Sequence, residues 1–134
     1  MQEEIGFYYI INHGISRDLI DAAIEQVRLL HGLPMEEKLK LKVDERTTGY
    51  VPIKSTIYVT TDAGDNSQYD LNENYRIVRD RSEDHPSVIA GRRFTGPNKW
   101  PSAEILPDFK TVMLQYYAAM EALGHPMLPL YALT

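Results

Sequence analysis

Hydrophobic and polar positions recur at different periods along the chain, and these periods predict its first elements. Residues 5–12 form a short, nearly continuous run of aromatic and β-branched side chains, which is typical of a strand buried on both faces. Over residues 17–31 the apolar positions recur at helical spacing and share one face, namely Ile20, Ala23, Ile24, Val27 and Leu30. The chain therefore opens with a predicted strand, a turn and an amphipathic helix.

The ends of this helix carry separate signals. Ser16 can accept a hydrogen bond from the first turn as an N-cap, and Gly32 is well placed to end the helix. Pro34 then suits the start of a second, shorter helix, predicted over residues 35–41.

The pattern becomes irregular between residues 47 and 101, where short extended pieces alternate with Gly, Pro, Asn and Asp. The best strand candidates are residues 57–61 and 71–78. Since no repeat, low-complexity tract or linker interrupts the chain, we expect a single unit of the α+β class.

A last amphipathic helix is predicted after Pro107, which suits a first helical position, with apolar residues at helical spacing from Phe109 to Leu123. Gly124 and Pro126 predict a break or kink after it. The apolar face of this helix is wide and requires a partner surface. The apolar run that ends at Thr134 carries no stop signal, so the sequence resembles an interrupted one.

Composition narrows the class of protein. The chain has 134 residues, of which 43% are hydrophobic, and its 19 acidic residues outnumber 14 scattered basic ones, so we expect no nucleic-acid partner. No apolar run reaches the roughly 18 residues that span a bilayer, and we expect no membrane partner and a cytoplasmic location. The absence of cysteine excludes disulfides and thiolate sites.

The motifs that carry chemistry are not found. None of the four histidines begins the His-x-Asp/Glu pair of non-haem iron sites, and there is no zinc spacing, Gly-x-Ser-x-Gly elbow or phosphate-binding glycine loop. His13 lies in an Asn-His-Gly turn, where a structural role is favoured. We therefore predict no catalytic and no metal-binding residue in this chain. Tyr50 and Tyr75, in the irregular middle, are the side chains best placed for ligand contacts.

Residues 6–15, Gly-Phe-Tyr-Tyr-Ile-Ile-Asn-His-Gly-Ile, resemble the N-terminal signature of the isopenicillin N synthase-like family of 2-oxoglutarate- and Fe(II)-dependent dioxygenases. The match continues in order across nearly the whole chain, which makes it far more specific than any single motif. The further segments are Leu33-Pro34 with Glu36-Glu37-Lys38, Gly49-Tyr50-x-Pro52, Asp70-Leu71-x-Glu73-x-Tyr75, Gly96-Pro97-Asn98-x-Trp100-Pro101, Leu106-Pro107-x-Phe109 and Tyr116-Tyr117-x-x-Met120.

The resemblance implies an α+β N-terminal domain over residues 1–134, truncated at both ends. Its helices and short strands would pack on a double-stranded β-helix (jelly-roll) barrel that is largely missing from this chain. The parent enzyme would use Fe(II) and 2-oxoglutarate on a small-molecule substrate, through ligands beyond Thr134, and the chain alone would bind neither. The missing C-terminal barrel of the same protein would be its partner.

The region around Gly49-Tyr50 reaches the substrate side of the pocket in some family members, so the resemblance points to Thr47 and Tyr50 as substrate-binding residues. Penicillin-forming relatives have a carboxylate-binding arginine where this chain has Thr47. That departure argues against a penicillin-type tripeptide substrate.

Two hypotheses follow from these observations. The first is an N-terminal segment of an oxygenase that contributes scaffold and one edge of the substrate pocket. The alternative is a non-catalytic binding or interaction domain derived from the same fold.

Overall fold

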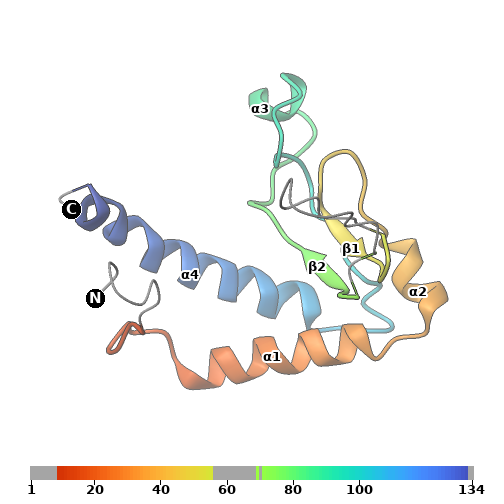
Figure 1. Ribbon diagram of the computed structural model, residues 1–134, viewed down its shortest axis with the longest axis horizontal. Coiled ribbons are helices and arrows are strands. Elements are labelled where there is room, and N and C mark those ends of the chain that lie inside the picture. The colour runs from red at the N-terminus through yellow and green to blue at the C-terminus, as the bar shows by residue number, and fades with distance from the viewer. Residues whose placement is uncertain (1–8, 56–68, 70, 133–134) are drawn as a thin grey trace, which may run out of the picture.

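The computed structural model describes residues 9–55, 69 and 71–132, which form helices and a two-stranded sheet. In chain order the elements are α1 (Arg17–His31), α2 (Met35–Lys40), β1 (Gly49–Val51), β2 (Asn74–Arg76), α3 (Pro86–Ile89) and α4 (Phe109–Tyr131). The long helices α1 and α4 pack together and run antiparallel, and α2 and the sheet lie at the end where α1 finishes and α4 begins (Figure 1). The predicted α+β class is confirmed.

Helix α1 has the predicted bounds, because Ser16 and Gly32 make the hydrogen bonds expected at its two ends. The hydroxyl of Ser16 accepts a hydrogen bond from the amide of Leu19 at 3.2 Å, and the amide of Gly32 donates to the carbonyl of Arg28 at 3.0 Å. Its apolar stripe is only partly covered: Leu30 is 1% exposed, whereas Ile24 is 60% exposed. Helix α2 starts as predicted and ends one residue early.

The hydrophobic core lies where the end of α1, α2, the sheet and the start of α4 meet. Its buried members are Leu30, Leu41, Tyr50, Leu106 and Phe109. Half-buried residues pack around them, among them Tyr75 and Trp100, whose rings lie 5.5 and 6.3 Å from the ring of Phe109. Edge-on contacts of this kind stabilise aromatic clusters.

The strand prediction over residues 5–12 is wrong for its described part. Residues 9–12 are extended or bent without pairing, Tyr9 and Ile11 are 99% and 80% exposed, and Asn12 takes a left-handed conformation with φ 57°. A run of this composition needs strands beside it, and the described part of the chain places none there. Residues 5–8, and the strand predicted over 57–61, lie outside the described residues.

Strand β2 covers only three of the eight residues predicted over 71–78. It pairs antiparallel with β1, which is equally short, in the register Gly49 with Arg76, Tyr50 with Tyr75 and Val51 with Asn74. Pro52 follows β1 directly and has no N–H to extend the ladder. Beyond β2, Val78 is held by the side chain of Asn98 instead of by a strand.

Two expectations about the last helix, Pro107 at its first position and a break after Leu123, are wrong, whereas a kink stays a prediction. Helix α4 begins at Phe109, so Pro107 lies before it, and the helix continues through Gly124, Pro126 and Pro129 to Tyr131. Both prolines are exposed. Because water can reach the carbonyls that lose their helical donors, the missing hydrogen bonds cost less here than in a buried helix. No helix in the described part of the chain is long and apolar enough to cross a membrane.

Candidate functional site

The turn between α2 and β1 carries Thr47, the first of the two predicted substrate-binding residues. Its amide donates to the carbonyl of Asp44 at 2.9 Å, and its hydroxyl donates to the carbonyl of Arg46 at 2.6 Å. Thr47 adopts φ 64°, a left-handed conformation that β-branched residues rarely take and that costs about 1–3 kcal/mol. The turn therefore holds a half-buried threonine in a strained backbone.

Gly49 follows with φ 109°, and its lack of a side chain is required by packing. A Cβ at this position would lie 2.3 Å from the carbonyl oxygen of Leu41. The strand can approach that carbonyl closely enough for the amide of Tyr50 to donate to it at 2.8 Å. Glycine thus fixes β1 against the end of α2.

Tyr50, the second predicted residue, is 0% exposed. Its hydroxyl donates to the carboxylate of Glu73 and lies 3.9 Å from the sulfur of Met35. Burial raises the pKa of Tyr50 to about 12, and the negative charge of Glu73 acts in the same direction. The side chain points into the protein, so within this chain its partner is Glu73.

Glu73 precedes β2 and gathers three side chains from three other elements. Besides Tyr50, the Lys38 ammonium donates to its Oε2 at 3.0 Å, and Nδ1 of His31 lies 3.2 Å from its Oε1. The hydrogen bond from Tyr50 and the charges of Lys38 and His31 hold the pKa of Glu73 below its usual range, against the effect of burial. We call these four residues the Glu73 cluster.

The Glu73 cluster does not fit a metal ion. A carboxylate and an imidazole face each other, but the Lys38 ammonium already lies against the same carboxylate and also donates to the carbonyl of His31 at 3.1 Å. Among residues 9–55, 69 and 71–132, no group of three or more His, Asp or Glu side chains could hold a metal. The described residues therefore provide no iron site.

A second set of motif residues binds the sheet and the residues after β2 to the segment that precedes α4. The Tyr75 hydroxyl donates to the carbonyl of Lys99, and burial raises the pKa of Tyr75 well above its usual value. The buried Asn98 accepts from the amide of Val78 at 2.9 Å and donates to the carbonyl of Val78 at 2.8 Å. Asn98 thus replaces a neighbouring strand for the segment after β2.

Three of the motifs quoted from the sequence, those that contain Tyr50, Glu73 with Tyr75, and Phe109, therefore meet in space. Tyr50 and Tyr75 are partners in the ladder, Glu73 binds Tyr50, and Phe109 packs on Tyr75. Sequence patterns did not predict the Glu73 cluster, although the Glu73-x-Tyr75 motif contains its central carboxylate. Substrate contacts of Thr47 and Tyr50 stay predictions.

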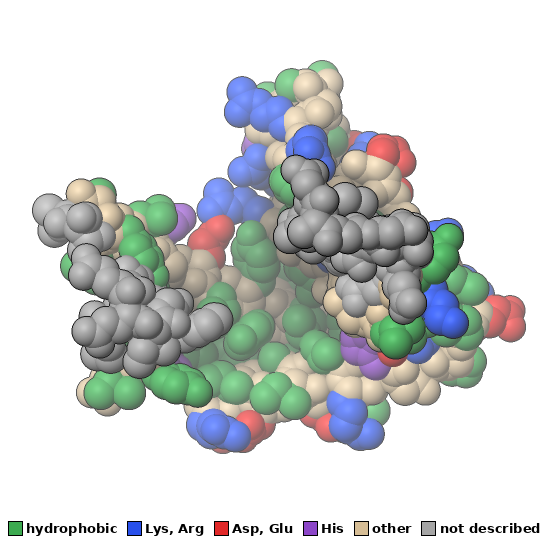
Figure 2. All heavy atoms as spheres, in the orientation of Figure 1, with side chains coloured by type: hydrophobic (Ala, Val, Ile, Leu, Met, Phe, Trp, Pro, Cys, Tyr) green, Lys and Arg blue, Asp and Glu red, His purple; other side chains and the backbone are tan. Residues whose placement is uncertain are grey.

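Two apolar grooves lie along the helices. One, of about 230 Å³, is lined by Ile20, Ala23, Ile24 and Val27 of α1 and by Met113 and Tyr116 of α4, in the region where hydrophobic side chains gather in Figure 2. We call it the α1–α4 groove.

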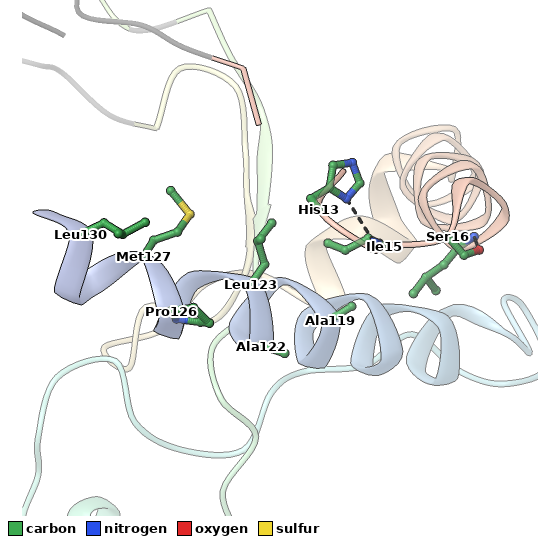
Figure 3. Close-up of a pocket in the computed structure, with 11 residues that line it drawn as sticks. His13, Ile15, Ser16, Ala119, Ala122, Leu123, Pro126, Met127 and Leu130 are labelled. Carbon is green, nitrogen blue, oxygen red and sulfur yellow. Dashed lines mark hydrogen bonds between the residues drawn. The ribbon is translucent and has the colours of Figure 1, made fainter. Parts of the chain in front are cut away.

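The second groove, of about 500 Å³, lies between the start of α1 and the last turns of α4. Figure 3 shows His13 and Ile15 on one side and Ala119, Leu123 and Met127 on the other. The ring of His13 is held in its turn, because its Nδ1 accepts from the amide of Ile15 at 3.1 Å.

Comparison with known proteins shows which family the chain resembles. Residues 2–103 match the family model described as "non-haem dioxygenase in morphine synthesis N-terminal". The chain is 38% identical to kihadalactone A synthase of Citrus sinensis over 84% of its own length and 32% of that protein. It is 31% identical to a 2-oxoglutarate-Fe(II) type oxidoreductase of Emericella nidulans, covering 96% of this chain and 36% of that one.

A solved structure agrees with the sequence relatives. A 2OG-Fe(II) oxygenase family protein from Caulobacter crescentus superposes with a TM-score of 0.62 at 29% identity, over 82% of this chain and 33% of the other. This chain thus spans only about a third of the length of each of these relatives. The resemblance found in the sequence is confirmed, and the chain belongs to the family of N-terminal domains of 2-oxoglutarate- and Fe(II)-dependent non-haem dioxygenases.

Proposed function

We propose that this chain is the N-terminal segment of an Fe(II)- and 2-oxoglutarate-dependent oxygenase that acts on a small molecule. In this role residues 1–134 form one domain that supplies scaffold and one edge of the substrate pocket. The observation that carries the proposal is the match of residues 2–103 to the N-terminal family model, together with relatives about three times as long as the chain.

The scaffold role is supported by the convergence of the family motifs on packing contacts. Phe109 is 0% exposed and contacts Tyr75 and Trp100. The buried hydroxyl of Tyr50 donates a hydrogen bond to Glu73. Residues used in this way specify a fold and perform no chemistry of their own. The described residues also lack a metal site, so in this proposal the ligands for iron and 2-oxoglutarate come from the remainder of the enzyme.

The partner in this proposal is the C-terminal barrel of the same protein. The α1–α4 groove is apolar, and Ile24 beside it is 60% exposed. Exposed apolar patches of this kind mark surfaces that are covered by another protein element. Because the relatives continue for about two-thirds of their length outside the matched region, a covering element is available within one polypeptide.

Thr47 is the best residue for the substrate edge. Backbone strain concentrates at ligand-binding positions, where surrounding structure keeps the costly conformation in place. Thr47 carries such strain, and the Gly49–Leu41 contact and the Tyr50–Glu73 hydrogen bond fix the strand directly after it. In this arrangement Thr47 contacts the substrate, and the buried side chain of Tyr50 keeps the strand that follows Thr47 in place.

A cytoplasmic location of the enzyme is also part of the proposal.

A split-protein experiment tests this function. The 134-residue chain and the C-terminal part that the proposal requires are produced separately, then mixed with Fe(II), 2-oxoglutarate and dioxygen. We expect the mixture to convert 2-oxoglutarate to succinate, while Fe(II) titration of the chain alone shows no stoichiometric site by calorimetry. Micromolar Fe(II) binding by the chain alone would contradict the assignment of the ligands to the other part.

The natural reading frame separates this proposal from the alternative, a non-catalytic binding domain. A stop codon directly after Thr134 in the natural gene would favour that domain and would remove the oxygenase proposal for this polypeptide. A reading frame that continues into a His-x-Asp pair and a distant histidine would favour the enzyme.

A further inference from the structure

The Glu73 cluster joins α1, α2 and both strands of the sheet through one set of polar contacts. His31 is the last residue of α1, Lys38 lies in α2, Tyr50 lies in β1, and Glu73 stands directly before β2. One carboxylate therefore connects the helical layer to both strands of the sheet. The side chain of Lys38 is 8% exposed, and that of Glu73 is 31% exposed, so solvent screens this contact weakly.

The cluster contains a single negative charge. Its other members are an ammonium, an imidazole and a neutral hydroxyl, and all three approach the carboxylate of Glu73. If this carboxylate is neutralised, the buried ammonium of Lys38 loses its counter-charge, which is costly in a site of low dielectric.

We propose that Glu73 is an acid-sensitive latch: protonation of its carboxylate releases Lys38 and Tyr50 and lets the β1–β2 sheet separate from α1 and α2. The separation loosens the part of the core that Leu30, Tyr50 and Phe109 share, and we expect the α1–α4 helix pair to remain folded. The proposal does not depend on the oxygenase assignment, since it concerns contacts within this chain alone.

The direction of the pH effect follows from the lowered pKa of Glu73. In an unfolded chain a glutamate titrates near pH 4.3. The folded state binds the proton less readily, so the stabilisation is fully present above that pH and is lost as the pH falls through the lower, folded value. The latch is closed at neutral pH and opens in acid.

Amide hydrogen exchange of the full 134-residue chain tests the latch. The reporters are the amides of Val43 and Tyr50, which bond the end of α2 to β1 at 2.8 Å each, and the amide of Val112 in α4 serves as reference. From about pH 7 to about pH 3.5 we expect protection at the reporters, corrected for intrinsic exchange, to fall by up to about sevenfold more than at Val112.

Substitutions make the result specific. Glu73→Gln should reproduce the weakly protected state at about pH 7 and remove most of the acid response. Glu83→Gln is the matched control, because Glu83 also has a lowered pKa and an ion pair, with Arg46 at 2.6 Å, but lies exposed. This variant should behave as the wild type does.

The double variant Lys38→Met with Glu73→Gln should regain protection at neutral pH, because no unpaired charge then remains buried. It also keeps the proposal testable if the single variant does not fold. Wild-type protection that is equal at both pH values, or an acid response that persists in Glu73→Gln, would overturn the latch.

Discussion

The carboxylate of Glu73 accepts a hydrogen bond from the buried hydroxyl of Tyr50, a residue 23 positions earlier in the chain. The contact links a tyrosine after Gly49 to a glutamate before β2, because loss of Glu73 would remove the acceptor of the buried Tyr50 hydroxyl. It also fixes the strand that follows Thr47.

Removal of the Lys38 charge should be far more damaging than removal of the Lys40 charge nearby on the same helix. Lys38→Met leaves Glu73 with one cation fewer in a site that solvent screens weakly, and we expect a loss of about 2–3 kcal/mol in the free energy of unfolding. Lys40 pairs with Glu37 at 2.6 Å on the surface, where solvent screens the pair, so Lys40→Met should leave the free energy of unfolding almost unchanged. Urea denaturation measures both, and equal losses would show that the Glu73 cluster does not stabilise the fold.

Gly49→Ala should destabilise the chain by about 3 kcal/mol or more, because the new Cβ would overlap the carbonyl oxygen of Leu41 at 2.3 Å. Gly91→Ala is the control, because Gly91 also has a positive φ, which disfavours any residue with a Cβ, but has no neighbouring atom that the Cβ would meet. It has φ 62°, and a Cβ added there would meet no atom within 4 Å, so Gly91→Ala should cost about 1–2 kcal/mol. The two variants can be compared by thermal unfolding. A Gly49→Ala variant as stable as Gly91→Ala would contradict the close approach of β1 to α2.

The helices could be predicted well because their signals are local. Ser16, the apolar stripe and Gly32 lie within one continuous segment, and α1 has the bounds that they indicate. The prolines of α4 misled the prediction, because the cost of an interior proline depends on whether the freed carbonyls reach water. That property belongs to the tertiary structure.

The strands and the Glu73 cluster could not be predicted from local pattern. The length of β2 is set by β1, its partner, and by Pro52. His31, Lys38 and Glu73 come together only through the packing of three elements, and each alone resembles an ordinary surface charge. The order of the motifs identified the family, but it could not indicate that Tyr50 and Glu73 bond to each other.

Tyr50 should ionise late in an alkaline titration. Its pKa is raised to about 12, so the folded state keeps the proton that an unfolded tyrosine releases near pH 10. The stability from this group is fully present below about pH 10 and is lost as the pH rises toward its folded pKa. Tyrosinate absorbance should therefore show a late component coupled to unfolding.

Tyr50→Phe should reduce that component, whereas Tyr9→Phe should retain it, because the Tyr9 ring is 99% exposed and does not touch the core. Tyr75 contributes to the late component as well, since burial raises its pKa in the same direction. A single early transition that accounts for all tyrosines while the protein remains folded would show that neither ring is protected.

The α1–α4 groove should make the isolated chain associate with itself. Ile24 borders the groove and is 60% exposed, so two copies can bury apolar area that the proposed C-terminal barrel would otherwise cover. Ile24→Glu should shift the sedimentation profile toward monomer with a change of under about 1 kcal/mol in monomer stability, because an exposed position tolerates a charge. Ile89→Glu is the matched control: Ile89 is 73% exposed but lies on α3, away from the groove. A wild-type chain that is monomeric at high concentration and melts in one sharp transition would contradict an uncovered docking face.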